Sequence, residues 1–389
     1  MNEAIVRIAA RGDGVTPSGR HVPFGVPGDA LLDDGALAFG PHHQEPPCRH
    51  FPECGGCQLQ HADDEAYRGY LTSRVETALA QHDLSAAIRA PYLSPPNSRR
   101  RATLKALQVA RGVLIGFNAE KSHRVVDMRE CHVLRPELLD LVQPLRELLA
   151  GKLMPRRIAE IQLTLIDGGA DVLLKGVPAG RLTEIEQLTA FAMKHDLARL
   201  SVDRGLGPDT LYEPHPASVT LSGARVAFPP GAFLQATADG EAELIACVQE
   251  AVAGAAKVGD LFAGLGTFAL AAGATYAAEA SRDAVAALKR AAPAMNVEHR
   301  DLYRSPLDGS ELKAFDTVIL DPPRAGAAEQ VGALTRSKVR RIAYVSCNPA
   351  TFGRDAKALA DGGYGIEWVQ PVGQFRWSTH VELAACFSR

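Results

Sequence analysis

One cysteine and two carboxylates stand at the ends of strand-like segments in the second half of the chain. Cys347 lies in Ser346-Cys347-Asn348-Pro349, just after an apolar run at 341–345. Asp321 ends another apolar run 26 residues upstream, and Glu382 lies 35 residues downstream. A thiolate can attack an electrophilic carbon, and a nearby carboxylate can accept a proton. This set therefore predicts covalent catalysis.

Each of these residues also has a purely structural interpretation. A cysteine is a small apolar side chain that packs well in cores, and Cys247 and Cys386 fit that role because they lie in apolar helix and strand patterns. Cys347 fits it poorly, because it ends its strand among polar neighbours. For Glu382 the structural alternative is a surface acid at the start of the last strand.

The elements that must position these groups alternate between helix and strand after Phe233. Helices are expected at 239–255, up to 272 and at 282–291, and strands at 258–262, up to 279 and at 317–321, 341–346, 365–369 and 381–387. This alternation predicts an α/β fold with a Rossmann-like, doubly wound and mainly parallel sheet. Its ligands bind beyond the carboxyl ends of the strands.

A glycine turn follows the first of these strands. The run from Asp260 to Phe268 turns at Gly264 and Gly266, and glycines there let the backbone approach a ligand at a helix N-terminus. Glu279 follows Asp260 by 19 residues, where a carboxylate can bind two ribose hydroxyls. Both nicotinamide and S-adenosylmethionine sites use such an acid. The third glycine of a dinucleotide fingerprint is missing, so S-adenosylmethionine is favoured.

The turn Asp321-Pro322-Pro323-Arg324 indicates which atom is methylated. Enzymes that methylate exocyclic amines carry an aromatic residue after the two prolines, and Arg324 stands there instead. Carbon is then the expected target. Carbon 5 of uracil becomes nucleophilic only after a thiolate adds at carbon 6, and a base must later remove its proton. Cys347 and Glu382 suit these two roles.

The first half of the chain has a different pattern. Short apolar pieces separated by Gly and Pro turns at 4–40 predict part of a small β-barrel. The mixed pattern further on, with strands at 104–109, 113–117, 161–166 and 172–174 and a helix at 135–149, predicts an α+β domain. The expected domains are 1–45 (β segment), 46–91 (cysteine-rich), 92–232 (central, RNA-binding) and 233–389 (catalytic).

The composition is that of an ordinary globular protein. The 389 residues carry a net charge of −3, which excludes a surface coated with positive charge but allows a local basic groove. Candidate patches are Arg99-Arg100-Arg101 with Lys105, Arg156-Arg157, and 336–341. The sequence shows neither an apolar run long enough for a membrane span nor a signal peptide. We therefore expect a cytoplasmic protein with reduced cysteines and no obligate protein partner.

Four further cysteines have metal-ligand spacing. Cys48, Cys54 and Cys57 form a C-x5-C-x2-C group, and Cys131 can complete a set of four thiols. Spacing alone does not separate a zinc site from an iron–sulfur cluster.

These motifs together identify a resemblance. From Cys48 to the C-terminus, and most densely from Gly231 onward, the chain resembles the bacterial RNA (uracil-5-)-methyltransferases, which form 5-methyluridine in ribosomal or transfer RNA. The resemblance implies Cys347 as nucleophile, Glu382 as base, and a methyl-donor site formed by Gln235, Phe262, Gly264, Gly266, Thr267, Glu279, Asp301 and Asp321. The chain departs from the family pattern at Thr237, where Asn is usual, at Ala263, where Cys is common, and at Thr267, where Asn is common.

The resemblance also bears on the cysteines and on the substrate. It implies that Cys48, Cys54, Cys57 and Cys131 hold a [4Fe–4S] cluster, and that 1–45 is a shortened version of the family's N-terminal TRAM barrel. The expected activity is methylation of a uridine in 23S ribosomal RNA, with a transfer-RNA uracil-54 enzyme as the alternative. From another class, a non-catalytic iron–sulfur RNA-binding protein would require the catalytic residues to be missing, and none is.

Overall fold

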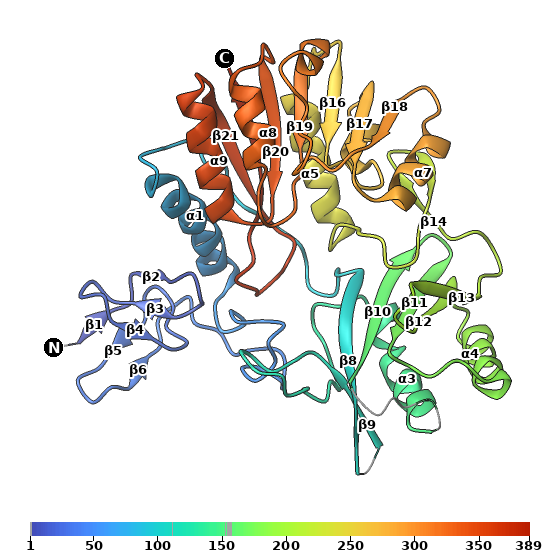
Figure 1. Ribbon diagram of the computed structural model, residues 1–389. Coiled ribbons are helices and arrows are strands. Elements are labelled where there is room, and N and C mark those ends of the chain that lie inside the picture. The colour runs from blue at the N-terminus through green and yellow to red at the C-terminus, as the bar shows by residue number, and fades with distance from the viewer. Residues whose placement is uncertain (1, 111, 152, 154–157) are drawn as a thin grey trace. The chain divides into compact units, whose positions relative to one another are not determined.

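The computed structural model describes residues 2–110, 112–151, 153 and 158–389 (Figure 1). The chain divides into two compact units. The first unit comprises the residues up to Pro47, then Gln58–Ser94 and Asp239–Arg389. The second unit comprises Cys48–Cys57 and Pro95–Ala238. The boundaries are thus interleaved along the sequence, because the ten residues that carry three of the cysteines leave the first unit for the second.

The first unit is organised around an eight-stranded sheet in the order β18-β17-β16-β19-β20-β22-β21-β7. Neighbouring strands from β18 to β20 are parallel, whereas β22 is antiparallel to both β20 and β21. The strands are β7 (Tyr92–Leu93), β16 (Val258–Leu261), β17 (Tyr276–Glu279), β18 (Asn296–His299), β19 (Thr317–Leu320), β20 (Arg341–Ser346), β21 (Gly365–Gly373) and β22 (Glu382–Ser388). The predicted strands at 258–262, 317–321, 341–346 and 381–387 are confirmed to within a residue.

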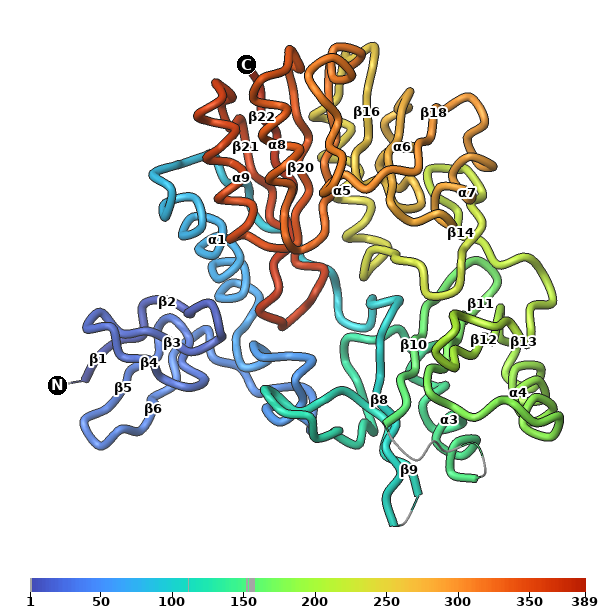
Figure 2. Tube along the Cα trace, viewed as in Figure 1, coloured from blue at the N-terminus to red at the C-terminus, as the bar shows by residue number. Residues whose placement is uncertain are grey.

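Helices cover both faces of this sheet, and Figure 2 follows the chain through them. They are α1 (Asp64–Ala80), α5 (Ala238–Ala251), α6 (Thr267–Ala271), α7 (Arg282–Ala291), the 3₁₀ turn η1 (Glu311–Ala314), α8 (Ala328–Thr335) and α9 (Pro349–Asp361). Strand side chains alternate between faces. In β20, Ile342 and Tyr344 pack with residues of α1, α8 and α9, whereas Ala343 and Val345 pack with residues of α5, α6 and α7.

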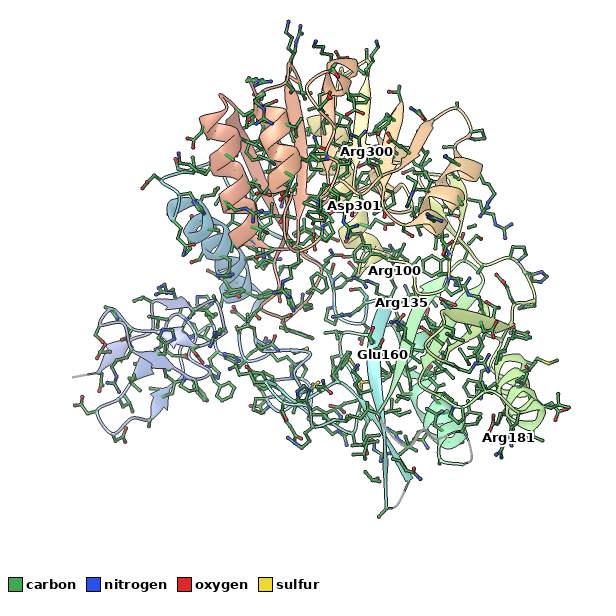
Figure 3. All side chains as sticks on the ribbon, in the orientation of Figure 1. Arg100, Arg135, Glu160, Arg181, Arg300 and Asp301 are labelled. Atoms are coloured by element: carbon green, nitrogen blue, oxygen red, sulfur yellow. The ribbon has the colours of Figure 1, made fainter. Side chains whose placement is uncertain are left out.

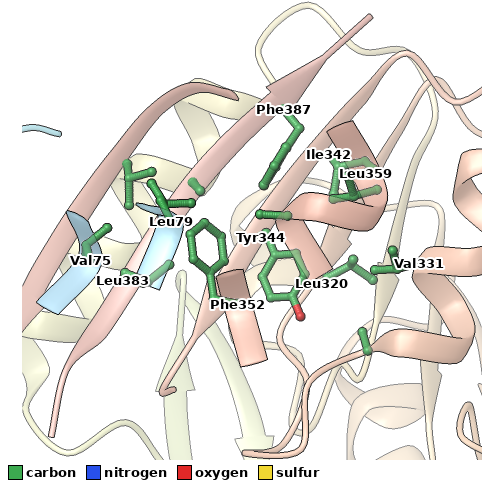
Figure 4. Packing of buried hydrophobic residues seen from close by; sticks show 14 of the residues in the cluster. Val75, Leu79, Leu320, Val331, Ile342, Tyr344, Phe352, Leu359, Leu383 and Phe387 are labelled. Atoms are coloured by element: carbon green, nitrogen blue, oxygen red, sulfur yellow. The ribbon is translucent and has the colours of Figure 1, made fainter. Parts of the chain in front are cut away.

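Figure 4 shows the first of these two cores. Leu79 of α1, Phe352 and Leu359 of α9 and Val331 of α8 are all almost fully buried there. The second core includes Cys247 and Cys386, which are 4% and 2% exposed. Their predicted role as packing residues agrees with that burial. Each core fixes the strands from one side, so the carboxyl ends of the parallel strands form a rigid edge.

The N-terminal part of the first unit forms two small sheets rather than one continuous barrel sheet. One has the order β1-β5-β6 and the other β2-β3-β4. Their strands are β1 (Glu3–Ala4), β2 (Arg7–Ile8), β3 (Gly14–Val15), β4 (His21–Val22), β5 (Ala30–Leu31) and β6 (Leu37–Ala38). Short strands follow from the closely spaced glycine and proline turns.

The second unit contains a six-stranded sheet in the order β13-β12-β11-β10-β8-β9 and a hairpin of β14 and β15. The strands are β8 (Arg101–Val109), β9 (Gly112–Gly116), β10 (Ala159–Ile166), β11 (Gly169–Lys175), β12 (Arg199–Asp203), β13 (Pro208–Tyr212), β14 (Ser218–Leu221) and β15 (Ala224–Ala227). Its helices are α2 (Pro136–Leu139), α3 (Val142–Leu149) and α4 (Leu182–Lys194). This is the α+β arrangement that the sequence predicted.

One predicted helix is wrong in detail. The expected helix at 135–149 is interrupted after Leu139, and α3 starts again at Val142. Pro144 has no N–H, so it cannot bond the carbonyl of Asp140 as a continuous helix would require. Near the start of α3 the missing donor costs nothing, because the first-turn N–H groups have no partner within the helix.

Within the described part of the chain, no helix combines the length and the apolarity that crossing a membrane requires.

Candidate active site

Strand register brings Cys347 and Glu382 together. In the antiparallel pair of β20 and β22, Ser346 is the partner of Leu383. Cys347 directly follows the last residue of β20, and Glu382 is the first residue of β22. The thiol and the carboxylate therefore lie at the same end of two paired strands, although they are 35 residues apart in the sequence.

Asp321 reaches the same edge from the other side of β20. It follows β19, which pairs in parallel with β20 so that Leu320 lies beside Tyr344. Burial and the neighbouring Glu279 raise the pKa of Asp321 to about 7. The edge therefore holds carboxylates in a desolvated environment, where Asp321 is about half protonated at neutral pH.

The nucleophile candidate is half-buried in this acidic environment. Burial, followed by the negative charges of Glu382 and Asp321, raises the pKa of the Cys347 thiol to about 11. Arg324 acts in the opposite direction. Without substrate, Cys347 is consequently a thiol rather than a thiolate at neutral pH.

A neighbouring amide orients the base candidate. Glu382 is 4% exposed, and its Oε2 accepts a hydrogen bond of 3.0 Å from Nε2 of Gln374, itself 1% exposed. A buried carboxylate requires such donors. The sequence analysis missed Gln374, which follows the end of β21 and bears no motif; only the fold of 374–382 places it beside Glu382.

The glycine turn after β16 has the backbone that a close-approaching ligand requires. Phe262 has φ of 68° and Gly266 has φ of 90°, both in the left-handed region. A Cβ on Gly266 would overlap the side chain of Leu288, so only glycine fits. Gly264 also has positive φ, and Thr267 begins α6 directly after the turn.

Glu279 is tied to this turn. Its Oε2 accepts a hydrogen bond of 3.0 Å from the N–H of Gly264, and its Oε1 accepts one of 2.7 Å from the N–H of Ser281. The carboxylate is thereby fixed at the carboxyl end of β17. This is the place where the sequence analysis expected an acid to bind ribose hydroxyls.

A second acid, Asp301, lies beyond β18 (Figure 3), and Tyr303 follows it two residues later in the chain. Asp301 follows Arg300 at the end of that strand, and its Oδ1 accepts a hydrogen bond of 3.0 Å from the N–H of Tyr303. The Tyr303 ring packs against Phe262, with the ring centroids 5.5 Å apart. Sequence patterns gave no reason to choose Tyr303, because an aromatic residue in a loop has no distinctive spacing.

Asp260 lies on β16, just before the glycine turn. It is fully buried, and burial together with Asp321 and Glu279 holds its pKa well above the usual range. Its place on this strand was predicted, but its raised pKa depends on carboxylates from other strands.

The raised pKa of Asp321 leads to a prediction about the stability of the folded protein. Its pKa is about 7 in the folded protein and 3.8 when unperturbed. Between these values the folded state keeps a proton that the unfolded state has lost, so this residue lowers stability as pH rises from about 4 to 7. We expect Asp321→Asn to raise the melting temperature at pH 8 by a few degrees, and the gain to shrink towards pH 4. Differential scanning calorimetry without ligands tests this; a less stable variant at pH 8 would contradict it.

Gln235, expected at the methyl-donor site, belongs to the second unit. It is 4% exposed, and its backbone carbonyl accepts a hydrogen bond of 3.1 Å from Nε of Arg100. The structure thus brings Phe262, Gly264, Gly266, Glu279 and Asp301 to the sheet edge of the first unit. It does not assign Gln235 to that unit.

The four cysteines with metal-ligand spacing all belong to the second unit. Cys54 pairs with the chain at Ala119 in an isolated bridge, and the N–H of Gly55 donates to the carbonyl of Asn118 over 3.0 Å. Cys54 interacts electrostatically with Cys48 and Cys131. Nevertheless, no three His, Cys, Asp or Glu side chains form a metal-ion site within the residues that the structure describes.

The predicted basic patches differ in how exposed their arginines are and in the partners that these side chains have. Arg99, Arg100 and Arg101 are only partly exposed; Nε of Arg99 donates to the Arg101 carbonyl over 3.0 Å, and Arg101 stacks on Phe233 at 4.3 Å. These side chains have structural partners as well as charge. In the 336–341 stretch Arg336 and Arg340 are exposed. The Arg156-Arg157 pair lies outside the described residues.

Comparison with known proteins identifies the family. The family model described as tRNA (Uracil-5-)-methyltransferase matches residues 288–389. A protein of Zymomonas mobilis named as an RNA methyltransferase is 50% identical over 99% of both chains. The 23S rRNA (uracil(1939)-C(5))-methyltransferase RlmD of Photorhabdus laumondii is 30% identical, covering 91% of this chain and 84% of its own.

The fold is also found among solved structures. The tRNA (uracil-54, C5)-methyltransferase of Pyrococcus abyssi, solved in complex with S-adenosyl-L-homocysteine, matches with a TM-score of 0.76 over 100% of this chain and 99% of its own, at 24% identity. The predicted α/β fold class is thereby confirmed. With the relatives above, it follows that the chain belongs to the RNA (uracil-5-)-methyltransferase family.

Proposed function

We propose that this protein methylates carbon 5 of one uridine in 23S ribosomal RNA, with S-adenosylmethionine as methyl donor, Cys347 as nucleophile and Glu382 as base. The observation that carries the proposal is the pairing of β20 with β22, in which Ser346 is the partner of Leu383. Cys347 directly follows β20 and Glu382 begins β22, so both lie at the same edge of the sheet. The donor turn at Gly264 and Gly266 opens at the same edge, because β16, β19 and β20 are parallel neighbours.

The reaction follows from these groups. The Cys347 thiol first loses its proton to solvent. The thiolate sulfur then adds to carbon 6 of uracil, and the electron pair of the 5,6 double bond moves into the carbonyl at carbon 4 as an enolate. Carbon 5 then takes the methyl group, which S-adenosylmethionine supplies from its sulfonium. Glu382 removes the proton from carbon 5, the 5,6 double bond re-forms, and the Cys347 thiolate leaves.

The residues of the first unit suit the methyl donor. Glu279 is held by two backbone N–H groups in a position to accept hydrogen bonds from ribose hydroxyls. Phe262 and Tyr303 offer an aromatic wall for a purine ring, and Asp301 stands beside them.

Ribosomal RNA is the proposed substrate for two reasons. The 30% identical relative from Photorhabdus laumondii carries that activity in its name. The four cysteines also match the ribosomal-RNA branch in the sequence resemblance. The target uridine must leave its stack, because sulfur has to attack from above the ring plane.

Mapping 5-methyluridine in a deletion strain tests the choice of substrate. Loss of one 5-methyluridine from 23S ribosomal RNA, restored by the wild-type gene but not by a Cys347→Ala gene, is expected. Loss from transfer RNA alone would assign the enzyme to the other branch. Unchanged 5-methyluridine in both RNAs would overturn the proposed function.

We further propose that Cys48, Cys54, Cys57 and Cys131 hold a [4Fe–4S] cluster. The supporting observation is that 48–57 joins the unit of Cys131 while the residues on both sides belong to the other unit. Arg99 also interacts electrostatically with Cys57 and Cys131, so it can offset part of the negative charge of thiolates there. When bound, such a cluster would link the two segments, a structural role.

Iron analysis tests the cluster. Protein made and purified without oxygen is expected to be brown, with broad absorption near 400 nm and about four irons per chain. Cys54→Ser should lose most of the iron, whereas Cys247→Ser, which changes a core cysteine of the first unit, should keep it. One zinc per chain and no iron, from iron-replete anaerobic cells, would refute the cluster.

A further inference from the structure

The loop that follows Asp321 is fastened to the helix that follows Cys347. We refer to residues 322–327 as the Pro-Pro-Arg loop. Nδ2 of Asn348 donates a hydrogen bond of 3.0 Å to the carbonyl of Arg324, and Oγ1 of Thr351 donates one of 3.3 Å to the same oxygen. One turn later, Nη2 of Arg354 donates to the carbonyl of Ala325 over 2.9 Å. The backbone of this loop therefore follows one face of α9.

A buried carboxylate completes this contact. Asp355 is 1% exposed, and its Oδ2 accepts hydrogen bonds of 2.7 Å from the N–H of Ala327 and 2.6 Å from the hydroxyl of Tyr344. Its Oδ1 accepts one of 2.9 Å from Nε of Arg354. Asp355 thus joins α9, β20 and the loop.

The loop fits closely against this carboxylate. Gly326 has φ of +81°, and a Cβ there would lie 2.7 Å from Oδ2 of Asp355 and 2.5 Å from Nη2 of Arg354. Only glycine allows that approach. On its other side, the Gly326 carbonyl accepts a hydrogen bond of 3.0 Å from the hydroxyl of Tyr303.

Arg324 is the residue whose place depends on the loop. Its side chain is exposed, and its guanidinium makes no hydrogen bond or ion pair with the described residues, so only the backbone fixes where it stands. Its backbone carbonyl is bonded to the side chain of Asn348, the residue that directly follows Cys347, and its positive charge opposes the two carboxylates that raise the pKa of the thiol. The charged groups that act on the thiol are Glu382 from β22, Asp321 from the end of β19, and Arg324 from the loop.

We propose that Asp355 is a positioning residue for the nucleophile: by holding the Pro-Pro-Arg loop against α9 it keeps Arg324 beside Cys347, where the cation offsets the charges of Asp321 and Glu382. Asp355 itself does not touch the substrate. Tyr344, Thr351 and Arg354 serve the same purpose through their own hydrogen bonds. The effect of losing any of them is transmitted through the backbone to the position of one exposed cation.

The test is the alkylation rate of Cys347 by iodoacetamide in the wild-type protein and its variants between pH 7 and 9.5, followed by mass spectrometry of the Cys347 peptide. The rate reports the thiolate fraction, which changes about tenfold per pKa unit below the pKa. Arg324→Gln should slow alkylation at a given pH by about threefold, because the cation is exposed and partly screened, and Asp355→Asn should slow it by about twofold. If Asp355→Asn does not fold, Tyr344→Phe and Thr351→Val replace it in the test. These milder changes should also slow the alkylation of Cys347.

A matched control separates positioning from loss of a buried hydrogen bond. Tyr364 is 3% exposed, and its hydroxyl donates to the carbonyl of Val339 over 2.8 Å, away from the loop. Tyr364→Phe should leave Cys347 alkylation unchanged while costing similar stability. The double variant Arg324→Gln/Asp355→Asn should react no more slowly than Arg324→Gln alone, because Asp355 acts through Arg324.

Two results would overturn the proposal. One is wild-type alkylation in both Asp355→Asn and Tyr344→Phe, and the other is full additivity in the double variant. The inference rests on Cys347 being the nucleophile of the proposed function. Alkylation needs neither RNA nor methyl donor, however, so a failure here is distinguishable from a failure to find 5-methyluridine.

Discussion

Cys347→Ala is expected to lower 5-methyluridine formation by more than about a thousandfold, because carbon 5 of uracil cannot attack a methyl sulfonium unless a nucleophile first adds at carbon 6. Affinity for S-adenosylmethionine should stay within about twofold of the wild type, since Cys347 is not among the residues at the glycine turn. Single-turnover transfer of a labelled methyl group to RNA, with donor binding by calorimetry, measures both quantities.

A core cysteine provides the control. Cys386→Ala lies on β22, the strand that begins with Glu382, and changes a fully buried thiol that no proposed step uses. It should keep activity at a stability cost of about 1 kcal/mol. Wild-type turnover by Cys347→Ala would rule out the covalent mechanism.

Trapping with a fluorinated RNA gives independent evidence for the covalent bond between the Cys347 sulfur and carbon 6 of uracil. RNA containing 5-fluorouridine at the target position should form a complex with the wild-type protein that survives denaturation, since fluorine cannot be removed as a proton. The Cys347→Ala protein should form none. A denaturation-resistant complex in that variant would show that another cysteine forms the covalent bond to the RNA.

Glu382→Gln should stop the reaction at a later point. The amide keeps the shape of the carboxylate but cannot take the carbon-5 proton, so a methylated RNA adduct on Cys347 is expected to accumulate. Turnover should fall by about a hundredfold or more. Gel electrophoresis under denaturing conditions, with the label in the methyl group, shows whether the retained RNA already carries it.

The neighbouring strand offers a matched acid. Glu367 is exposed on β21, and Glu367→Gln should release product at the wild-type rate. If Glu382→Gln turns over normally without any adduct, the base is another group, with Asp321 as the next candidate. If the Glu382→Gln protein loses RNA binding instead, Glu382 contributes to RNA binding rather than to removal of the carbon-5 proton.

The pH dependence follows from the same charges. The Cys347 thiol has a pKa of about 11 in the absence of RNA. Adduct formation with 5-fluorouridine RNA at subsaturating concentration should therefore rise with pH from about 6 to 9, because the thiolate fraction grows over that range. The direction is opposite to that expected of a reaction limited by a protonated acid.

Local patterns sufficed for most elements of the catalytic sheet. Apolar runs ending in Gly or Pro marked β16, β19 and β20, and helix α7 was predicted at the residues it occupies, 282–291. These predictions succeed because buried parallel strands and amphipathic helices carry their periodicity in the chain itself. The strand β7 was missed, because a two-residue edge strand has too few residues to show a pattern.

The three candidate residues Cys347, Asp321 and Glu382 lie at strand ends, as the sequence predicted, but their proximity depends on the topology of the sheet. The sequence alone determined that Cys347, Asp321 and Glu382 each end or begin a strand. That β22 enters between β20 and β21, antiparallel to both, follows only from how the whole sheet packs between its two helical layers.

By itself the sequence determined the chemistry this protein can perform, because a thiol, carboxylates and glycine turns keep their intrinsic reactivity and backbone freedom wherever they are placed. The tertiary structure alone decided which groups act on one another. It brought Gln374 into a hydrogen bond with Glu382 and Asp355 into a hydrogen bond with the backbone of the Pro-Pro-Arg loop. It also placed residues 48–57 in the same unit as Cys131. Those pairings join residues far apart in the chain, and they arise from packing and long-range hydrogen bonding, which no local pattern of residues encodes.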